Sequence, residues 1–212
     1  GVDVFFVISG YLITQRIVIG HETGGFDFKQ FYVRRIRRLF PAMVTTIAGT
    51  MFAGVILLDP NALMSLSRSA ISATFSVANI HYFLEAGYWD TSSWTKPLLH
   101  TWSLGVEEQF YILWPLIVLL LLKYVDSIKK RIMIIAFFLL GSFFWAQSVI
   151  FTDHSFAYYM FFTRAWELMA GAIVALLVHS GFRIKPITSE MLSFFGLLFI
   201  GLSLAFVSDL DP

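Results

Sequence analysis

Six long apolar stretches constrain what this chain of 212 residues can fold into. A helix that crosses the hydrocarbon core of a bilayer needs about 20 mostly apolar residues, because each residue advances the helix by only about 1.5 Å. Stretches of about this length occur at 2–19, 40–58, 104–122, 132–151, 160–179 and 191–207. They predict an all-α fold, a polytopic membrane helix bundle with six spanning helices.

The composition supports this class of protein and excludes several others. Hydrophobic residues make up 58% of the chain and charged residues 14%, and the mean hydropathy is +0.75. The formal net charge of +1 gives no basis for nucleic-acid binding. The absence of cysteine excludes a disulfide framework and a thiol nucleophile. Because the chain starts at Gly1 within an apolar run, we expect residues 1–212 to be part of a single integral-membrane domain, truncated at both ends.

A seventh, weaker apolar stretch at 63–84 carries Arg68, Asn79 and His81. The positive-inside rule places basic segments on the cytoplasmic side. If 63–84 crossed the membrane, the basic segment 123–131 would lie opposite the basic segment 29–38. If it enters and returns, these two and the basic segment at 183–185 share one side. We therefore expect an external re-entrant or interfacial segment here, followed by an external loop at 85–103.

Four arginines in five residues, Arg34, Arg35, Arg37 and Arg38, stand in "FYVRRIRRLFP". We expect Pro41 in the first turn of the helix that follows them. The cluster has two interpretations. It could anchor the chain at the cytoplasmic interface, or it could bind a ligand with several phosphates, because guanidinium groups match phosphate oxygens bidentately.

The stretch "HTWSLGVEEQF" places His100, Ser103, Glu107 and Glu108 at the entrance to an apolar run. Ser103 is a candidate N-cap, and the two glutamates would then interact favourably with the helix dipole. A second interpretation is a polar cavity wall, because Ser103, Glu107, Tyr111 and Trp114 share one helix face, which His100 would join if the helix began earlier. Ionisable residues inside a membrane are candidates for a functional site.

Two further positions are candidates for helix contacts. Arg164 and Glu167 are spaced to pair on one helix, either to neutralise each other near the interface or to form the external wall of the same cavity. Asp3 begins a span as a cap or dipole partner, and Gly10 permits close helix packing. The scattered histidines lack zinc-ligand spacing, so we expect no metal site.

Four segments together resemble the acyltransferase-3 family of bacterial membrane O-acyltransferases. They are "GVDVFFVISGYLI", "FYVRRIRRLFPA", "PLLHTWSLGVEEQFYILWP" and "TRAWELMAGAIVALL". The resemblance implies acetyl-CoA or another acyl-CoA as cytoplasmic donor. It also implies an acceptor that is a glycan or lipid-linked glycan of the cell envelope, such as lipopolysaccharide O-antigen, and a place in the bacterial inner membrane.

The resemblance also assigns residues. It implies that Arg35 and Arg38, with Arg34 beside them, contact the donor phosphates. The catalytic stretch maps to Ser103, Glu107 and Glu108, with His100 in support. The principal histidine of the family lies upstream of "GVDVFF" and is absent from this chain, so His100 is not its substitute. On this view the arginine cluster and the acid pair occupy opposite ends of a shared interior passage.

Two alternatives remain at this stage. A transporter or flippase of an anionic or lipid-linked solute would also contain buried charges and a re-entrant segment, although no two-fold hydropathy repeat is visible. A non-catalytic membrane scaffold would explain the apolar runs, but not an inward-facing polar stripe whose burial costs free energy.

Overall fold

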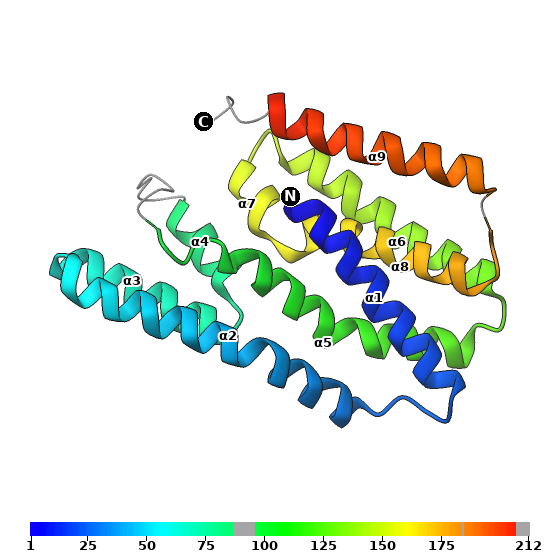
Figure 1. The fold of residues 1–212 in the computed structure, drawn as a ribbon, viewed down its shortest axis with the longest axis horizontal. Coiled ribbons are helices and arrows are strands. Elements are labelled where there is room, and N and C mark those ends of the chain that lie inside the picture. Colours follow the sequence, from blue (N-terminus) through cyan, green and yellow to red (C-terminus); the bar gives the residue numbers. More distant parts are fainter. Residues whose placement is uncertain (87–95, 184, 207–212) are drawn as a thin grey trace.

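The computed structural model describes residues 1–86, 96–183 and 185–206, and every regular element in these residues is an α-helix (Figure 1). Part of the predicted loop at 85–103 lies outside the described residues. The helices are α1 (Val2–Glu22), α2 (Phe28–Leu57), α3 (Pro60–Thr74), α4 (Ala78–Ala86), α5 (Thr101–Tyr124), α6 (Ile128–Val149), α7 (His154–Tyr159), α8 (Phe161–His179) and α9 (Pro186–Phe206).

Six helical segments in the described part of the chain are long and apolar enough to cross a membrane. They correspond to α1, α2, α5, α6, α7 with α8, and α9. The prediction of an all-α polytopic bundle with six spanning helices is therefore confirmed. Most of the predicted boundaries agree with the observed helix ends to within a few residues.

Helix α2 differs most from its predicted span, because it begins at Phe28 rather than near residue 40. The carboxylate of Asp27 caps it by accepting a hydrogen bond from the backbone N–H of Gln30 at 3.1 Å. The arginine cluster thus lies inside the helix, and the expectation that Pro41 begins it is wrong. Arginine is a good helix former. Membrane helices also tolerate the loss of the one backbone hydrogen bond that an internal proline removes.

Helices α3 and α4 form a helical hairpin, which is the shape expected of a re-entrant segment. Helix α3 runs back along α2, and α4 then returns along the start of α5, so that both outer ends of the hairpin lie at the same end of the bundle (Figure 1). The turn between them contains Ser76, whose φ of 57° is unfavourable for a residue with a side chain. From α5, Gln109 donates hydrogen bonds to the carbonyl of Ser76 at 3.5 Å and to Asn79 Oδ1, at the start of α4, at 2.9 Å, and thereby holds this turn.

The closest helix packing is between α1 and α8, where two glycines face the partner backbone. A Cβ atom at Gly10 would overlap the backbone of Leu168, and one at Gly171 would overlap the backbone of Val7. Both positions therefore require glycine, because only a residue without a side chain lets the helices approach this closely. The predicted role of Gly10 is confirmed.

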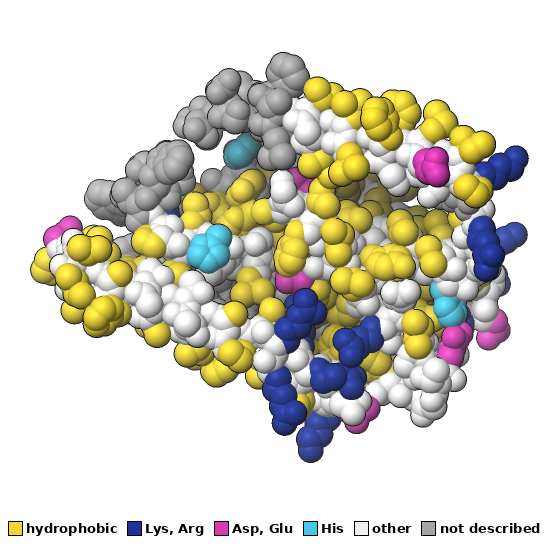
Figure 2. All heavy atoms as spheres, in the orientation of Figure 1, with side chains coloured by type: hydrophobic (Ala, Val, Ile, Leu, Met, Phe, Trp, Pro, Cys, Tyr) yellow, Lys and Arg dark blue, Asp and Glu magenta, His cyan; other side chains and the backbone are white. Residues whose placement is uncertain are grey.

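The two ends of the bundle differ in the charged residues that lie in or beside their connections. The α1–α2, α5–α6 and α8–α9 connections lie together at one end, with basic residues such as Lys129, Arg131 and Arg183 close by, and we call this the basic end (Figures 1 and 2). The α2–α3 and α6–α7 connections, with Asp59 and Asp153, lie at the opposite, acidic end. This is the arrangement that the positive-inside rule predicts for a re-entrant hairpin.

Candidate functional site

Three consecutive side chains of α5 connect three different parts of the bundle. Glu107 faces α1, Glu108 bonds to α2, and Gln109 bonds to the hairpin turn and the start of α4. Successive residues of an α-helix point in directions about 100° apart, so neighbouring side chains can reach three separate elements. Gly105 allows the hairpin turn to approach α5, because a Cβ atom there would lie 2.8 Å from Asn79 Oδ1.

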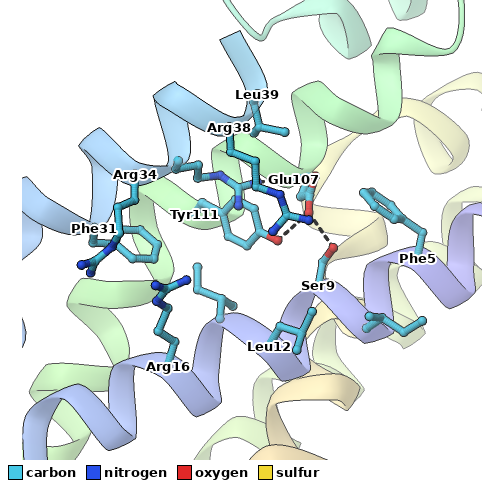
Figure 3. Close-up of a pocket in the computed structure, with 13 residues that line it drawn as sticks. Phe5, Ser9, Leu12, Arg16, Phe31, Arg34, Arg38, Leu39, Glu107 and Tyr111 are labelled. Atoms are coloured by element: carbon cyan, nitrogen blue, oxygen red, sulfur yellow. Dashed lines mark hydrogen bonds and ion pairs between the residues drawn. The ribbon is translucent and has the colours of Figure 1, made fainter. Parts of the chain in front are cut away.

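Glu107 is the centre of a buried hydrogen-bond network. Its side chain is 5% exposed, and its Oε1 atom accepts hydrogen bonds from Ser9 Oγ and Tyr111 Oη, both at 2.5 Å (Figure 3). Its other oxygen lies 3.5 Å from a guanidinium nitrogen of Arg35. A carboxylate buried in a membrane protein needs such partners, because an unpaired charge there is costly.

Arg35 joins the two glutamates. Its Nε donates to Glu108 Oε1 at 2.8 Å, and its guanidinium group lies 3.2 Å from the centroid of the Tyr111 ring. The prediction that the arginine cluster and the acid pair occupy opposite ends of a passage is therefore wrong. The cluster belongs to a helix and not to a loop at the membrane surface, so Arg35 lies two turns inside α2, at the level of the acids.

A cavity of about 290 Å³ lies between α1, α2 and α5, and we call it the arginine cavity. Arg16, Arg34 and Arg38 extend towards it from two helices, while Ser9, Glu107 and Tyr111 form another part of its wall (Figure 3). Its remaining lining is Phe5, Ile8, Leu12, Ile13, Phe31, Arg35 and Leu39. Arg16 lies in the second half of α1 and Arg34 near the start of α2, so these cations mark the side nearer the basic end.

The structure brings together most of the predicted site residues. Arg34, Arg35, Arg38 and Glu107 line the arginine cavity, and Glu108 adjoins it through Arg35. Of the predicted stripe on α5, Trp114 also faces α1, where it donates a hydrogen bond to Thr14 Oγ1 at 2.7 Å.

His100 and Ser103 are not part of this site. Helix α5 begins at Thr101, so Ser103 lies in its first turn and donates to the carbonyl of His100 at 3.1 Å. The prediction that Ser103 is the N-cap is wrong, because the helix starts at Thr101, two residues before Ser103. His100 occupies the N-cap position without a side-chain cap bond and is exposed.

Sequence reasoning missed Arg16 and the role of Ser9. Both lie on α1, seven residues apart, which places them on one helix face. An arginine within an apolar helix is itself a signal for a functional site. A serine is not, because its hydroxyl can bond to the backbone of its own helix.

Two other polar clusters do not belong to the arginine cavity. Arg164 pairs with Glu167 at 3.1 Å and also with Asp3 at the start of α1. The predicted pair is confirmed as a charge-neutralising contact within α8, and Asp3 extends it to α1. The interpretation as a wall of the same cavity is wrong, because neither Arg164 nor Glu167 lines it.

The second cluster is on the hairpin, where Ser69 lies 3.2 Å and Glu85 lies 3.4 Å from His81 Nε2. Burial lowers the pKa of His81, with smaller opposing and reinforcing effects from Glu85 and Lys96. Both neighbours approach the same ring nitrogen, whereas a catalytic relay uses one neighbour on each nitrogen. The cluster therefore joins α3 to α4 and does not form a triad.

Comparison with known proteins places the chain in a family. The model of the acyltransferase domain family, Acyl_transf_3, matches residues 1–211, and the chain belongs to this family. Peptidoglycan O-acetyltransferase OatA of Listeria monocytogenes is 36% identical over all of this chain and 36% of its own length. A Bacillus subtilis protein, YrhL, provisionally named a peptidoglycan O-acetyltransferase, is 38% identical over 83% of this chain and 28% of its own length.

A Haemophilus influenzae protein named as uncharacterized is 35% identical over 82% of this chain and 73% of its own length. This chain thus spans about a third of the Listeria and Bacillus relatives. No solved structure matches it. The resemblance inferred from the four sequence segments is confirmed, and the six spans identify a multi-pass membrane protein.

Proposed function

We propose that the protein is a membrane O-acyltransferase, which moves an acyl group, acetyl in the simplest case, from cytoplasmic acyl-CoA to a hydroxyl of a cell-envelope glycan. The observation that carries the proposal is the arginine cavity. In a chain of the acyltransferase family, Arg16, Arg34 and Arg38 meet a buried Ser9–Glu107–Tyr111 network across one cavity.

The assignment of the acyl-CoA site depends on the charges in the arginine cavity. Coenzyme A carries several phosphate groups, and arginine forks bind phosphate oxygens with two parallel hydrogen bonds. Arg35 is already held by ion pairs with Glu107 and Glu108. We therefore assign the binding of the donor phosphates to the other three arginines that line the cavity, Arg16, Arg34 and Arg38. The apolar side chains of Ile8, Leu12 and Ile13 would pack along the uncharged arm of the coenzyme.

The chemistry requires a proton acceptor inside the cavity. Transfer forms a bond between the acceptor oxygen and the acyl carbon, breaks the C–S bond of the thioester, and leaves the hydroxyl proton on the coenzyme A thiol. Glu107 is the carboxylate that lines this cavity, and Arg35 and Tyr111 fix its orientation. We assign to Glu107 the hydrogen bond to the groups between which this proton moves.

The names of the relatives bear on the acceptor. OatA of Listeria is named for peptidoglycan, which favours a peptidoglycan sugar over lipopolysaccharide O-antigen within the class of cell-envelope glycans. We place the protein in the bacterial inner membrane, with the basic end in the cytoplasm where acyl-CoA is made. Incubation with labelled acetyl-CoA and either purified peptidoglycan fragments or lipopolysaccharide would identify the acceptor by where the label appears.

The experiment that tests the donor site uses the arginines of α2. Arg34→Ala or Arg38→Ala in the protein in detergent should weaken acetyl-CoA binding about tenfold or more, because each removes a charge-assisted hydrogen bond to phosphate. Arg37 lies in the same cluster and is exposed like Arg34 and Arg38, but it does not line the cavity. Arg37→Ala is therefore the matched control and should bind within about twofold of wild type.

Equal losses in all three variants would show that the cluster acts through total charge and not through the cavity. The transporter alternative makes a different prediction. Acetylation of the glycan must release one free coenzyme A thiol per ester formed, and a thiol reagent detects it. Movement of the glycan across the membrane without thiol release would overturn the acyltransferase proposal.

A further inference from the structure

A second cavity of about 170 Å³ lies on the other side of the Arg35–glutamate cluster, between α2, α5 and the hairpin turn. We call it the hairpin cavity. Its lining includes Ile36, Phe40 and Met43 from α2, Ser76 from the turn, and Glu108 from α5. Arg35 and Leu39 line both cavities, so these two side chains form the partition between them.

The two adjacent glutamates face different cavities. Glu107 lines the arginine cavity and Glu108 lines the hairpin cavity, while Arg35 contacts both carboxylates across the partition. Their free hydrogen-bonding capacity also differs. Glu107 already accepts from two hydroxyl groups, whereas among the described residues Glu108 accepts only from Arg35, through Oε1.

The linings of the two cavities select different ligands. Three arginines besides Arg35 line the arginine cavity, whereas Arg35 is the one cation among the residues that line the hairpin cavity. A phosphate would meet the carboxylate of Glu108 there without sufficient compensating charge. An ionised carboxylate only accepts hydrogen bonds, so Glu108 matches a neutral group that donates one, such as a sugar hydroxyl.

Size and position agree with this choice. Sites for whole drug-sized ligands measure about 300–1,000 Å³, and the hairpin cavity, at about 170 Å³, is of a size for one sugar ring of a longer glycan. The tip of the hairpin borders the cavity, and both outer ends of the hairpin lie at the acidic end of the bundle. The cavity is thus associated with the element that enters from the side opposite the basic end.

We propose that the hairpin cavity receives the hydroxyl-bearing sugar of the acceptor, which Glu108 holds by a hydrogen bond, so that acceptor and donor approach the Arg35 partition from opposite sides. This inference rests on the proposed function, and it gives the two glutamates separate tasks. Glu107 serves the donor side and Glu108 the acceptor side.

The test fills the hairpin cavity with a larger side chain. Met43→Trp should leave the Kd for acetyl-CoA within about twofold of wild type while glycan acetylation falls about tenfold or more. Val44→Trp is the matched control, because Val44 is the next residue of α2, does not line the cavity and is 42% exposed. It should change neither quantity. Leu12→Trp, in the arginine cavity, should show the opposite pattern and weaken acetyl-CoA binding.

A second variant avoids the added bulk. Glu108→Gln preserves the size of the side chain and should raise the KM for the glycan about tenfold, with the KM for acetyl-CoA within about twofold of wild type. If wild type acetylates glycan but both variants match it, or if acetyl-CoA binding falls in parallel with transfer, the assignment of the hairpin cavity is overturned and the proposed function stands. If wild type releases no coenzyme A thiol with any glycan, the proposed function itself fails.

Discussion

At the scale of single residues, Arg35 determines how the site is held together. It forms ion pairs with Glu107 and Glu108 and stacks on Tyr111. These contacts make it a poor candidate for the donor-phosphate role that the family resemblance implies, because a phosphate would have to compete with two carboxylates that are already in place. The neighbouring Arg34 and Arg38 face the cavity and keep that role in the proposal.

This arrangement predicts a stability effect. Arg35→Ala would leave two carboxylates within the bundle without a counter-charge, so the free energy of unfolding should fall by about 3 kcal/mol. Adding Glu107→Gln to Arg35→Ala should restore part of this loss, because it removes one of the stranded charges. Unfolding by titration with a denaturing detergent measures both, and Arg37→Ala is the control for loss of an exposed arginine.

A double variant that is no more stable than Arg35→Ala would show that the effect of Arg35 comes from packing against Tyr111 instead of from charge.

At the scale of helices, α1 packs against α8 with one face and lines the arginine cavity with another. Gly10 faces α8, while Ser9, Leu12 and Arg16 face the arginine cavity. The tight contact between α1 and α8 therefore fixes the rotation of α1 about its axis, and this rotation places Ser9 beside Glu107. Packing at the glycines and geometry at the site are consequences of the same helix position.

Substitution of the contact glycine should reveal this link. Gly10→Ala puts a methyl group into the backbone of Leu168, so overpacking should lower the free energy of unfolding by about 1–3 kcal/mol. Gly141→Ala on α6 is the control, because no atom lies within 4 Å of its added Cβ, and it should be neutral or stabilising by up to about 1 kcal/mol. The same detergent titration compares the two, and equal effects would contradict the close approach of α1 and α8.

The helices themselves could be predicted from the sequence, but the meeting of α2 and α5 could not. Apolar runs and loop charges are local properties, and they are sufficient to predict six spans and a re-entrant hairpin. The ion pairs of Arg35 depend on how far α2 extends before Pro41 and on its register against α5, and one sequence contains no direct record of either. Ser9 was missed for the same reason, since its partner is 98 positions away.

At the scale of the whole molecule, the hairpin decides the direction of every later helix. Because α3 and α4 together enter and return, α5 starts at the same end of the bundle as α3, and the α1–α2, α5–α6 and α8–α9 connections lie at the other, basic end (Figure 1). The proposed transfer from a cytoplasmic donor to an external acceptor would require this geometry. If the hairpin were a crossing helix, the α5–α6 connection would lie outside and the arginine cavity would lose its relation to the acyl-CoA pool.

Single introduced cysteines test this arrangement without background, because the chain contains no cysteine. Asn61→Cys lies at the outer end of α3 and Pro97→Cys lies just before α5, whereas Thr23→Cys and Asp126→Cys mark the basic end; all four positions are exposed. A maleimide that cannot cross membranes should label the first two in intact spheroplasts and the last two only after the membrane is permeabilised. Labelling of Asn61 and Pro97 from opposite sides would make 63–84 a spanning segment and would contradict an external approach of the acceptor to the hairpin cavity.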